Sequence, residues 1–184
     1  MRDKTATIKL RRIVLAGALI ACSAARAQFA PTGATTLSVT IGAEAALRVA
    51  TSTTALTPIS AMFDALVGAT DLTYKIRTTE TAGAGTLTVK VTPDLRSAKE
   101  PWASAPRSAE ADLTYTCAVA APGTGCIGSQ TASATTATTV ATFGAGASSS
   151  TSGNAGSTKW SLTNGQIFEP GAYSSTVTYT ISVI

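Results

Sequence analysis

The sequence predicts an all-β protein, an antiparallel β-sandwich of about seven to nine strands that follows a cleaved export signal. The composition favours strands, because Thr, Ser, Ala, Val and Gly are frequent and the usual helix formers Leu, Glu, Lys and Met are scarce. Apolar and polar residues alternate with a period of two, and sequences with Gly or Pro separate the alternating runs. Such alternation is typical of antiparallel sheets with one face in water.

Residues 1–27 have the layout of a secretory signal. A basic start precedes an apolar run at 13–21, and Ala25-Arg26-Ala27 forms a cleavage site before Gln28. The apolar run is shorter than the roughly 20 residues that a membrane-spanning helix needs. We therefore expect a protein without a transmembrane segment, located in the periplasm, at the cell surface or outside the cell, with one domain at 28–184.

Cys22 offers an alternative for this signal. Leu19-Ile20-Ala21-Cys22 resembles a bacterial lipobox, in which the cysteine becomes the acylated first residue of a lipoprotein. Cleavage after Ala27 would instead discard Cys22 with the signal, so lipid anchoring and simple secretion both stay open.

The charge of the chain argues against nucleic-acid binding. Of the 14 Lys and Arg, six lie in residues 1–27, as does one of the 10 Asp and Glu. The rest of the chain carries eight positive and nine negative groups, a net charge of −1. No basic surface is left to attract phosphates.

The strands are expected where apolar residues alternate with polar ones. The last segment, 173–183, shows the clearest alternation and is expected to be one long strand. The other apolar positions are Leu37, Val39 and Ile41; Ala45, Leu47 and Val49; Leu72, Tyr74 and Ile76; Leu87, Val89 and Val91; Leu113, Tyr115, Cys117 and Val119; Val140 to Phe143; Trp160 and Leu162.

Three stretches are less regular. Residues 96–111 are rich in charge and proline and are expected to form a long surface loop. Residues 145–158 are a low-complexity tract of Gly, Ser, Ala and Thr, and we expect a second surface loop there. Residues 59–67 fit either a short helix or an irregular strand.

Cys117 and Cys126 are expected to form a disulfide, because they are an even number of cysteines in an oxidising compartment. In the chain-entropy view, so short a loop would stabilise the fold by about 2 to 3 kcal/mol. Their spacing differs from the CxxC pattern of redox proteins.

The sequence contains few residues of the types that carry out catalysis. The chain has no histidine, which removes the commonest general base and metal ligand, and its carboxylates are scattered singly. We expect no catalytic residue, no metal site and no cofactor, and so a protein that is not an enzyme. Trp160 is assigned to the core, whereas Trp102 is either a loop anchor or part of a ligand contact.

The segment with Gly171, Tyr173, Val177, Tyr179 and Ile181 resembles the last strand of secreted immunoglobulin-like sandwich subunits. These are the spore-coat-U-like and fimbrial proteins, whose chains end in similar Gly-x-Tyr-x-x-Thr-Val-Thr runs. The resemblance implies an immunoglobulin-like fold and a role in a pilus-like fibre or surface coat. It also implies that an N-terminal strand of one subunit completes the sandwich of the next.

Residues 28–42 are the candidate for this donated strand, with Phe29, Leu37, Val39 and Ile41 filling apolar positions. The alternative is that this segment is the first strand of its own domain. Two functions follow: a structural subunit that self-assembles or pairs with other surface proteins, or a secreted or lipid-anchored module that binds a glycan or a protein.

Overall fold

The computed structural model describes residues 35–93, 95–97, 105–107 and 112–184. The chain divides into two compact units, residues 1–39 and residues 40–184. The described part of the first unit, residues 35–39, is exposed and contains no helix or strand. All the strands belong to the second unit.

The described residues form twelve strands, of which five have only two residues. The predicted all-β fold is therefore confirmed. The strands are β1 (Glu44–Val49), β2 (Thr57–Pro58), β3 (Leu66–Arg77), β4 (Gly85–Val91), β5 (Arg96–Ser97), β6 (Leu113–Val119), β7 (Thr124–Gly125), β8 (Gln130–Thr131), β9 (Thr138–Phe143), β10 (Asn154–Leu162), β11 (Tyr173–Ser174) and β12 (Val177–Val183).

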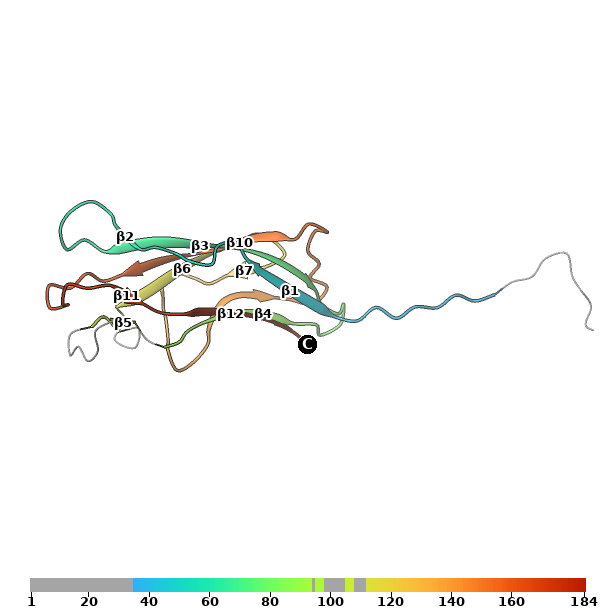
Figure 1. The fold of residues 1–184 in the computed structure, drawn as a ribbon. Helices are drawn as coiled ribbons and strands as arrows, with labels where there is room; N and C mark the ends of the chain where they lie inside the picture. The colour runs from blue at the N-terminus through green and yellow to red at the C-terminus, as the bar shows by residue number, and fades with distance from the viewer. Residues whose placement is uncertain (1–34, 94, 98–104, 108–111) are drawn as a thin grey trace, which may run out of the picture. The chain divides into compact units, whose positions relative to one another are not determined.

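Two antiparallel sheets pack face to face. Sheet A has the strand order β1-β3-β10-β6-β8, with β2 also paired to β3, and sheet B has the order β12-β4-β9-β7. Figure 1 shows β3, β10 and β6 in one layer and β4 and β12 in the other. The short strands β5 and β11 form a separate pair.

The strand order is immunoglobulin-like. In a constant-type immunoglobulin domain, strands A, B, E and D form one sheet and strands C, F and G form the other. Here β1, β3, β10 and β6 take the places of A, B, E and D, while β4 and β12 take those of C and F. Strand β9 lies on the other side of β4. Among the described residues, no strand takes the place of G beside β12.

The core lies between the two sheets and follows the alternation of the sequence. Leu87, Val89 and Val91 of β4 are fully buried, and the polar residues between them are not. Tyr115 and Trp160 stack with ring centroids 5.3 Å apart, which confirms the assignment of Trp160 to the core. Each such side chain stabilises the fold by about 1.5 to 3 kcal/mol on burial.

The expected loop at 145–158 is only partly correct. Strand β10 begins at Asn154 and lies in the centre of sheet A, so the last five residues of this tract, 154–158, belong to a strand. The loop before it is held in place: Ala147 is buried, and its N–H donates to Thr78 Oγ1 over 2.9 Å. Small side chains allow this close packing, which the composition alone did not suggest.

Other expectations are corrected in detail. Leu37, Val39 and Ile41 form no strand, and the first strand begins at Glu44. The expected last strand at 173–183 is divided into β11 and β12, which pair with different partners. Of the stretch 59–67, residues 59–63 form bends and a turn, residues 64–65 have no regular structure, and the last two residues begin β3. In the expected loop at 96–111, β5 occupies 96–97, residues 105–107 have no regular structure, and the rest lies outside the described residues.

The sandwich has two ends, which we call the base and the tip. At the base, β3 ends at Arg77 and β4 begins at Gly85, and Glu44 and Val183 lie opposite these two residues. At the tip lie the first residue of β3, the last residue of β10 and the first residue of β12. The C-terminus, labelled in Figure 1, is at the base end.

Candidate functional site

The outer edge of β12 carries backbone groups that pair with no other strand of the described chain. Strand β12 is seven residues long and stands at the end of sheet B, where it pairs with β4 on one side only. On the other side it faces β1, the edge strand of sheet A, but the two strands form no ladder within the described chain. An edge strand presents a row of backbone N–H and C=O groups that a further strand can bind.

The hydrogen bonds between β12 and β4 identify which backbone N–H and C=O groups of β12 point away from β4. Ile184 and Ala84 exchange two backbone hydrogen bonds, of 2.9 and 3.3 Å, and the N–H of Thr92 donates to the carbonyl of Thr176 over 2.7 Å. In an antiparallel ladder, bonded and non-bonded pairs alternate. The even-numbered residues of β12 therefore bond to β4, and the N–H and C=O groups of Val177, Tyr179, Ile181 and Val183 point outward.

The side chains of these four residues point toward the core and are half-buried, because no strand covers them from the open side. Tyr179 reaches across the sandwich, and its hydroxyl forms a hydrogen bond with Thr158 of β10 in the opposite sheet. Burial raises the pKa of Tyr179, although the hydrogen bonds to its hydroxyl act in the opposite direction. The open edge thus combines half-buried apolar side chains with the Tyr179 hydroxyl, which is bonded to the opposite sheet.

The candidate donated strand has the complementary pattern. Leu37, Val39 and Ile41 have exposed fractions of 96%, 83% and 62%, and no strand of the described chain pairs with them. Phe29, the fourth predicted residue of this segment, lies outside the described residues.

Apart from β1, the six-residue edge strand of sheet A that faces β12, the other edges of the sandwich are short or covered. On the far side from β12, the sheets end in β7 and β8, which have only two residues each. Beside β3, the chain between β1 and β2 follows the edge so closely that a Cβ atom at Gly68 would lie 2.6 Å from the carbonyl oxygen of Ala55. Short and covered edges resist pairing with other chains, so the long edges that remain are β12 and its neighbour β1, and β12 is the longer of the two.

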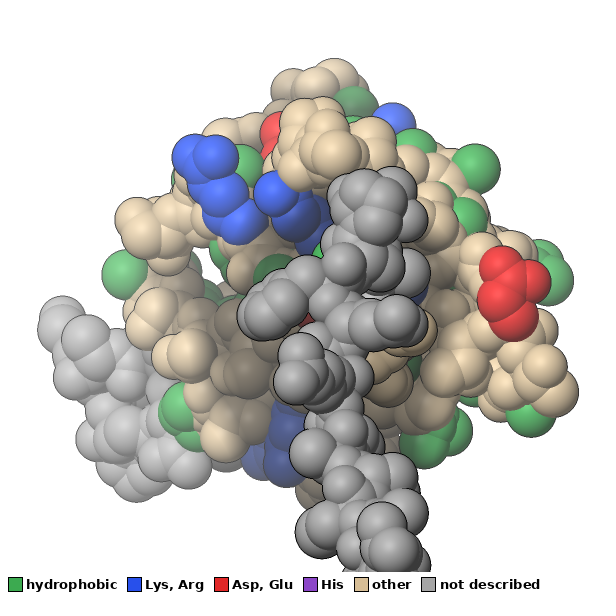
Figure 2. Space-filling view, turned by 90° about the vertical axis from the view of Figure 1, so that its right-hand side faces the viewer, with side chains coloured by type: hydrophobic (Ala, Val, Ile, Leu, Met, Phe, Trp, Pro, Cys, Tyr) green, Lys and Arg blue, Asp and Glu red, His purple; other side chains and the backbone are tan. Residues whose placement is uncertain are grey.

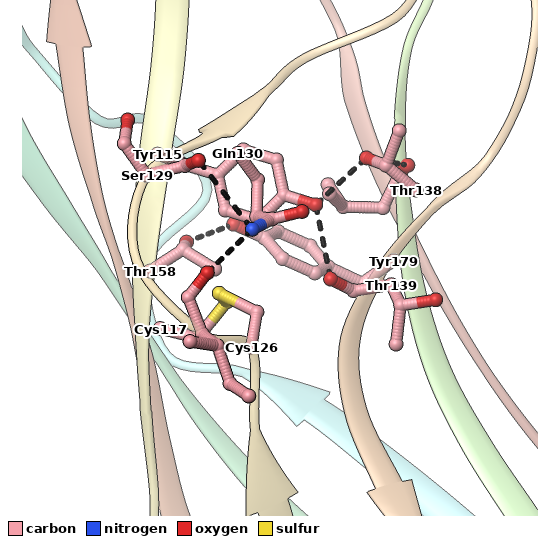
Figure 3. Close-up of a disulfide and its surroundings, with 11 residues drawn as sticks. Tyr115, Cys117, Cys126, Ser129, Gln130, Thr138, Thr139, Thr158 and Tyr179 are labelled. Carbon is pink, nitrogen blue, oxygen red and sulfur yellow. Dashed lines mark hydrogen bonds between the residues drawn. A yellow bond between two sulfur atoms is a disulfide. The ribbon is translucent and has the colours of Figure 1, made fainter.

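The predicted disulfide is present and protects the edge at β7. Cys117 of β6 and Cys126, which follows β7, have Cα atoms 5.4 Å apart, and the N–H of Cys126 donates to the carbonyl of Val140 over 3.0 Å. Figure 3 shows the bond beside Tyr115, whose hydroxyl contacts Thr138 and Thr139 of β9. The disulfide and Tyr115 thus join sheet A to sheet B.

The remaining predicted residues are placed as follows. Cys22 and Trp102 lie outside the described residues. Gly171 is exposed and Tyr173 is half-buried at the tip, where the Tyr173 hydroxyl donates to the carbonyl of Glu169 over 2.7 Å. They belong to the connection that precedes β12 and are separate from the open edge.

The tip carries a cavity and an apolar surface that sequence reasoning missed. The cavity has a volume of about 260 Å³, and Phe63, Phe168 and Tyr173 are among its lining residues. Ile59, Met62 and Ile167 are also exposed in the tip loops, with exposed fractions of 63%, 83% and 77%. Their sequence shows no periodic pattern, so only the structure could bring them together.

The turn at 60–64 holds Phe63 in an unusual conformation. Its φ angle is 66°, in the left-handed region that residues other than glycine rarely adopt. The Asp64 carboxylate accepts hydrogen bonds from the Ser60 hydroxyl (2.7 Å) and from the Ala61 N–H (2.8 Å), and these bonds lower the pKa of Asp64. Strained residues that are held in this way often lie at functional surfaces.

The described part of the chain contains no candidate metal site. Within it, no three His, Cys, Asp or Glu side chains gather closely enough to hold a metal ion. Nor does it contain a helix with the length and apolar character needed to cross a membrane.

Comparison with protein-family models, with curated proteins and with solved structures finds no match for this chain. The strand order, the open edge of β12 and the exposed N-terminal segment are the features of the described chain that bear on its function.

Proposed function

We propose that this protein is an extracytoplasmic structural subunit that assembles into a pilus-like fibre or surface coat by β-strand pairing. The observation that carries the proposal is the unpaired outer edge of β12, at the place where a complete immunoglobulin-type sheet has a further strand. Adding an extended segment to such an edge satisfies backbone groups and places alternate side chains in the core.

The N-terminal segment fits this edge in length and pattern. Residues 35–41 and β12 both have seven residues, so an antiparallel register places Ile41 opposite Val177 and Leu37 opposite Ile181. Donor residues at odd positions then meet the four residues of β12 with outward backbone groups. The three exposed aliphatic side chains then pack on the half-buried residues of β12, and the intervening Ser and Thr residues face water.

Chain length indicates that an antiparallel donor comes from another copy. In this register, residue 41 lies at the tip end of β12, whereas Glu44 of the same chain is at the base. The seven residues of β12 span about 20 Å. Three residue steps from Ile41 to Glu44 span at most about 11 Å. A chain can therefore place this segment on its own β12 only in the parallel direction.

The first experiment is size-exclusion chromatography with light scattering on the oxidised protein, comparing residues 28–184 with residues 44–184. We expect concentration-dependent polymers from the longer chain and monomers from the shorter one. A synthetic peptide of residues 28–43 should bind the shorter chain, whereas a peptide with L37D and V39D should not. A monomeric longer chain, with an unfolded shorter one, would show that the segment completes its own sandwich.

A binding module, secreted or lipid-anchored, is the second candidate. The aromatic cavity at the tip favours it, because ligand sites are concave and mostly apolar with a few polar groups. Such a module would remain monomeric at all concentrations, so the same chromatography separates the two functions.

A further inference from the structure

Several apolar residues of the tip are exposed in the described part of the chain. Met62 and Phe63 come from the turn before β3, and Ile167 comes from the connection after β10. We call these three residues and Ile59 the tip patch. Phe63 and Phe168, the chain neighbours of Met62 and Ile167, line the same cavity, so the two loops lie close together. Clustered exposed apolar residues of this kind mark an interaction site.

We propose that the tip patch is a second contact between successive copies of this chain, covered by the base of the copy that donates its N-terminal strand. This inference rests on the proposed function. It adds a rigid interface between the globular bodies to the paired strand.

The short connection after the donated strand brings the two bodies together. In the antiparallel register, Ile41 of the donor lies beside Val177 of the acceptor, at the acceptor's tip. Only Gly42 and Ala43 then separate the donated strand from Glu44, which is at the base of the donor's own sandwich. Because three residue steps span at most about 11 Å, the donor's base must lie next to the acceptor's tip.

The loops of the base carry few charges and lie beside the exposed Glu44–Arg77 ion pair. It contains the turn at 78–84, the loop at 144–150 and Ile184, which is 84% exposed. Gly, Ala, Ser and Thr predominate in the two loops, and Glu80 is their one charged residue. Figure 2 looks at this end, where uncharged atoms and scattered hydrophobic side chains surround a group of Lys and Arg side chains on one side and an acidic side chain on the other.

The conformation of the tip also suits a preformed contact. The Asp64 hydrogen bonds fix the turn that presents Met62 and Phe63, so little conformational entropy is lost when a second body covers them. A fibre joined by strand pairing alone would bend at the two-residue connection. Contact between tip and base would limit this bending.

The test is the reactivity of an introduced thiol. Met62→Cys and Ile167→Cys report on the tip patch, and Ile127→Cys is the control. Ile127 is 90% exposed and lies between β7 and β8, on the opposite side of the sandwich from β12. Each variant of residues 28–184 is alkylated with iodoacetamide, once as monomers and once as polymers separated by size.

We expect alkylation at positions 62 and 167 to be about tenfold or more slower in polymers than in monomers, and unchanged at position 127. Equal rates in monomers and polymers at both tip positions would overturn the inference and leave the tip free for another ligand. If the unmodified chain forms no polymers, the proposed function itself fails, and the two failures are therefore distinguishable.

Discussion

Replacing Ile181 with proline tests the open edge of β12 directly. The N–H of Ile181 points away from β4, so proline at this position removes no hydrogen bond from the sandwich. Proline is tolerated in edge strands where the N–H faces solvent. The same substitution removes a donor that an incoming strand needs. Ile181→Ala is the matched control, because it shortens the side chain but keeps the N–H.

The expected magnitudes follow from the geometry. Both variants lose the packing of one half-buried isoleucine, and we expect each to destabilise the sandwich by about 1 to 2 kcal/mol. Proline alone also loses one hydrogen bond to the donated strand, which contributes about 1 kcal/mol. Its ring further obstructs the approaching backbone. Together these effects weaken strand pairing by about tenfold or more relative to Ile181→Ala.

The assay is the protein concentration at which half of residues 28–184 is polymeric, measured by light scattering. Urea unfolding of each variant, followed by Trp fluorescence, verifies that the sandwich is intact. Ile181→Pro should need about tenfold or more protein than Ile181→Ala to reach the midpoint. If the two variants polymerise equally well while both remain folded, the outward edge of β12 is not the pairing site.

Three further predictions concern the sandwich itself. Gly153→Ala should destabilise it by about 2 to 3 kcal/mol, because φ is 89° and the new Cβ would lie 2.7 Å from a threonine methyl group of β3. Gly146→Ala, at a φ of 68° with open space around it, should lower stability by only about 1 kcal/mol. Thermal unfolding of both glycine variants measures the difference. Replacing Cys117 and Cys126 with alanine should lower stability by about 2 to 3 kcal/mol in urea. Stability should also fall as the pH rises above about 10, because burial raises the folded-state pKa of Tyr179 and so favours its neutral form. Below that pH this contribution is complete, and Tyr179→Phe should weaken the alkaline loss in a pH series of melting temperatures.

Much of the fold could be predicted from the sequence, because large apolar residues alternate wherever a strand has one face in the core. The buried residues of β4 and the Trp160 end of β10 follow that pattern, and both were predicted. The beginning of β10 was missed for a physical reason. Its inward positions there are Gly156 and Thr158, whose small side chains fit a closely packed centre but give no periodic hydrophobic signal.

The open edge could be predicted only in part. The alternation of Leu37, Val39 and Ile41 indicates a strand, but the same pattern suits a strand of its own sandwich and a strand donated to another. Only the strand order identifies the vacant place beside β12. The tip patch had no sequence signal at all, since isolated aliphatic residues in loops are common on protein surfaces.

The arrangement of edges indicates what kind of assembly this chain can form. Each copy offers the edge of β12, beside the edge strand β1, and one exposed segment at 35–41, while β7 and β8 are short and are fastened near the disulfide. One acceptor and one donor per copy produce a heterologous contact, which extends as an unbranched filament unless a ring closes. Without the disulfide, β7 could separate from β9 and expose a second edge. On this reasoning the Cys117–Cys126 bond keeps assembly linear, so reduced protein should form branched or irregular aggregates by electron microscopy, whereas oxidised protein should form single filaments.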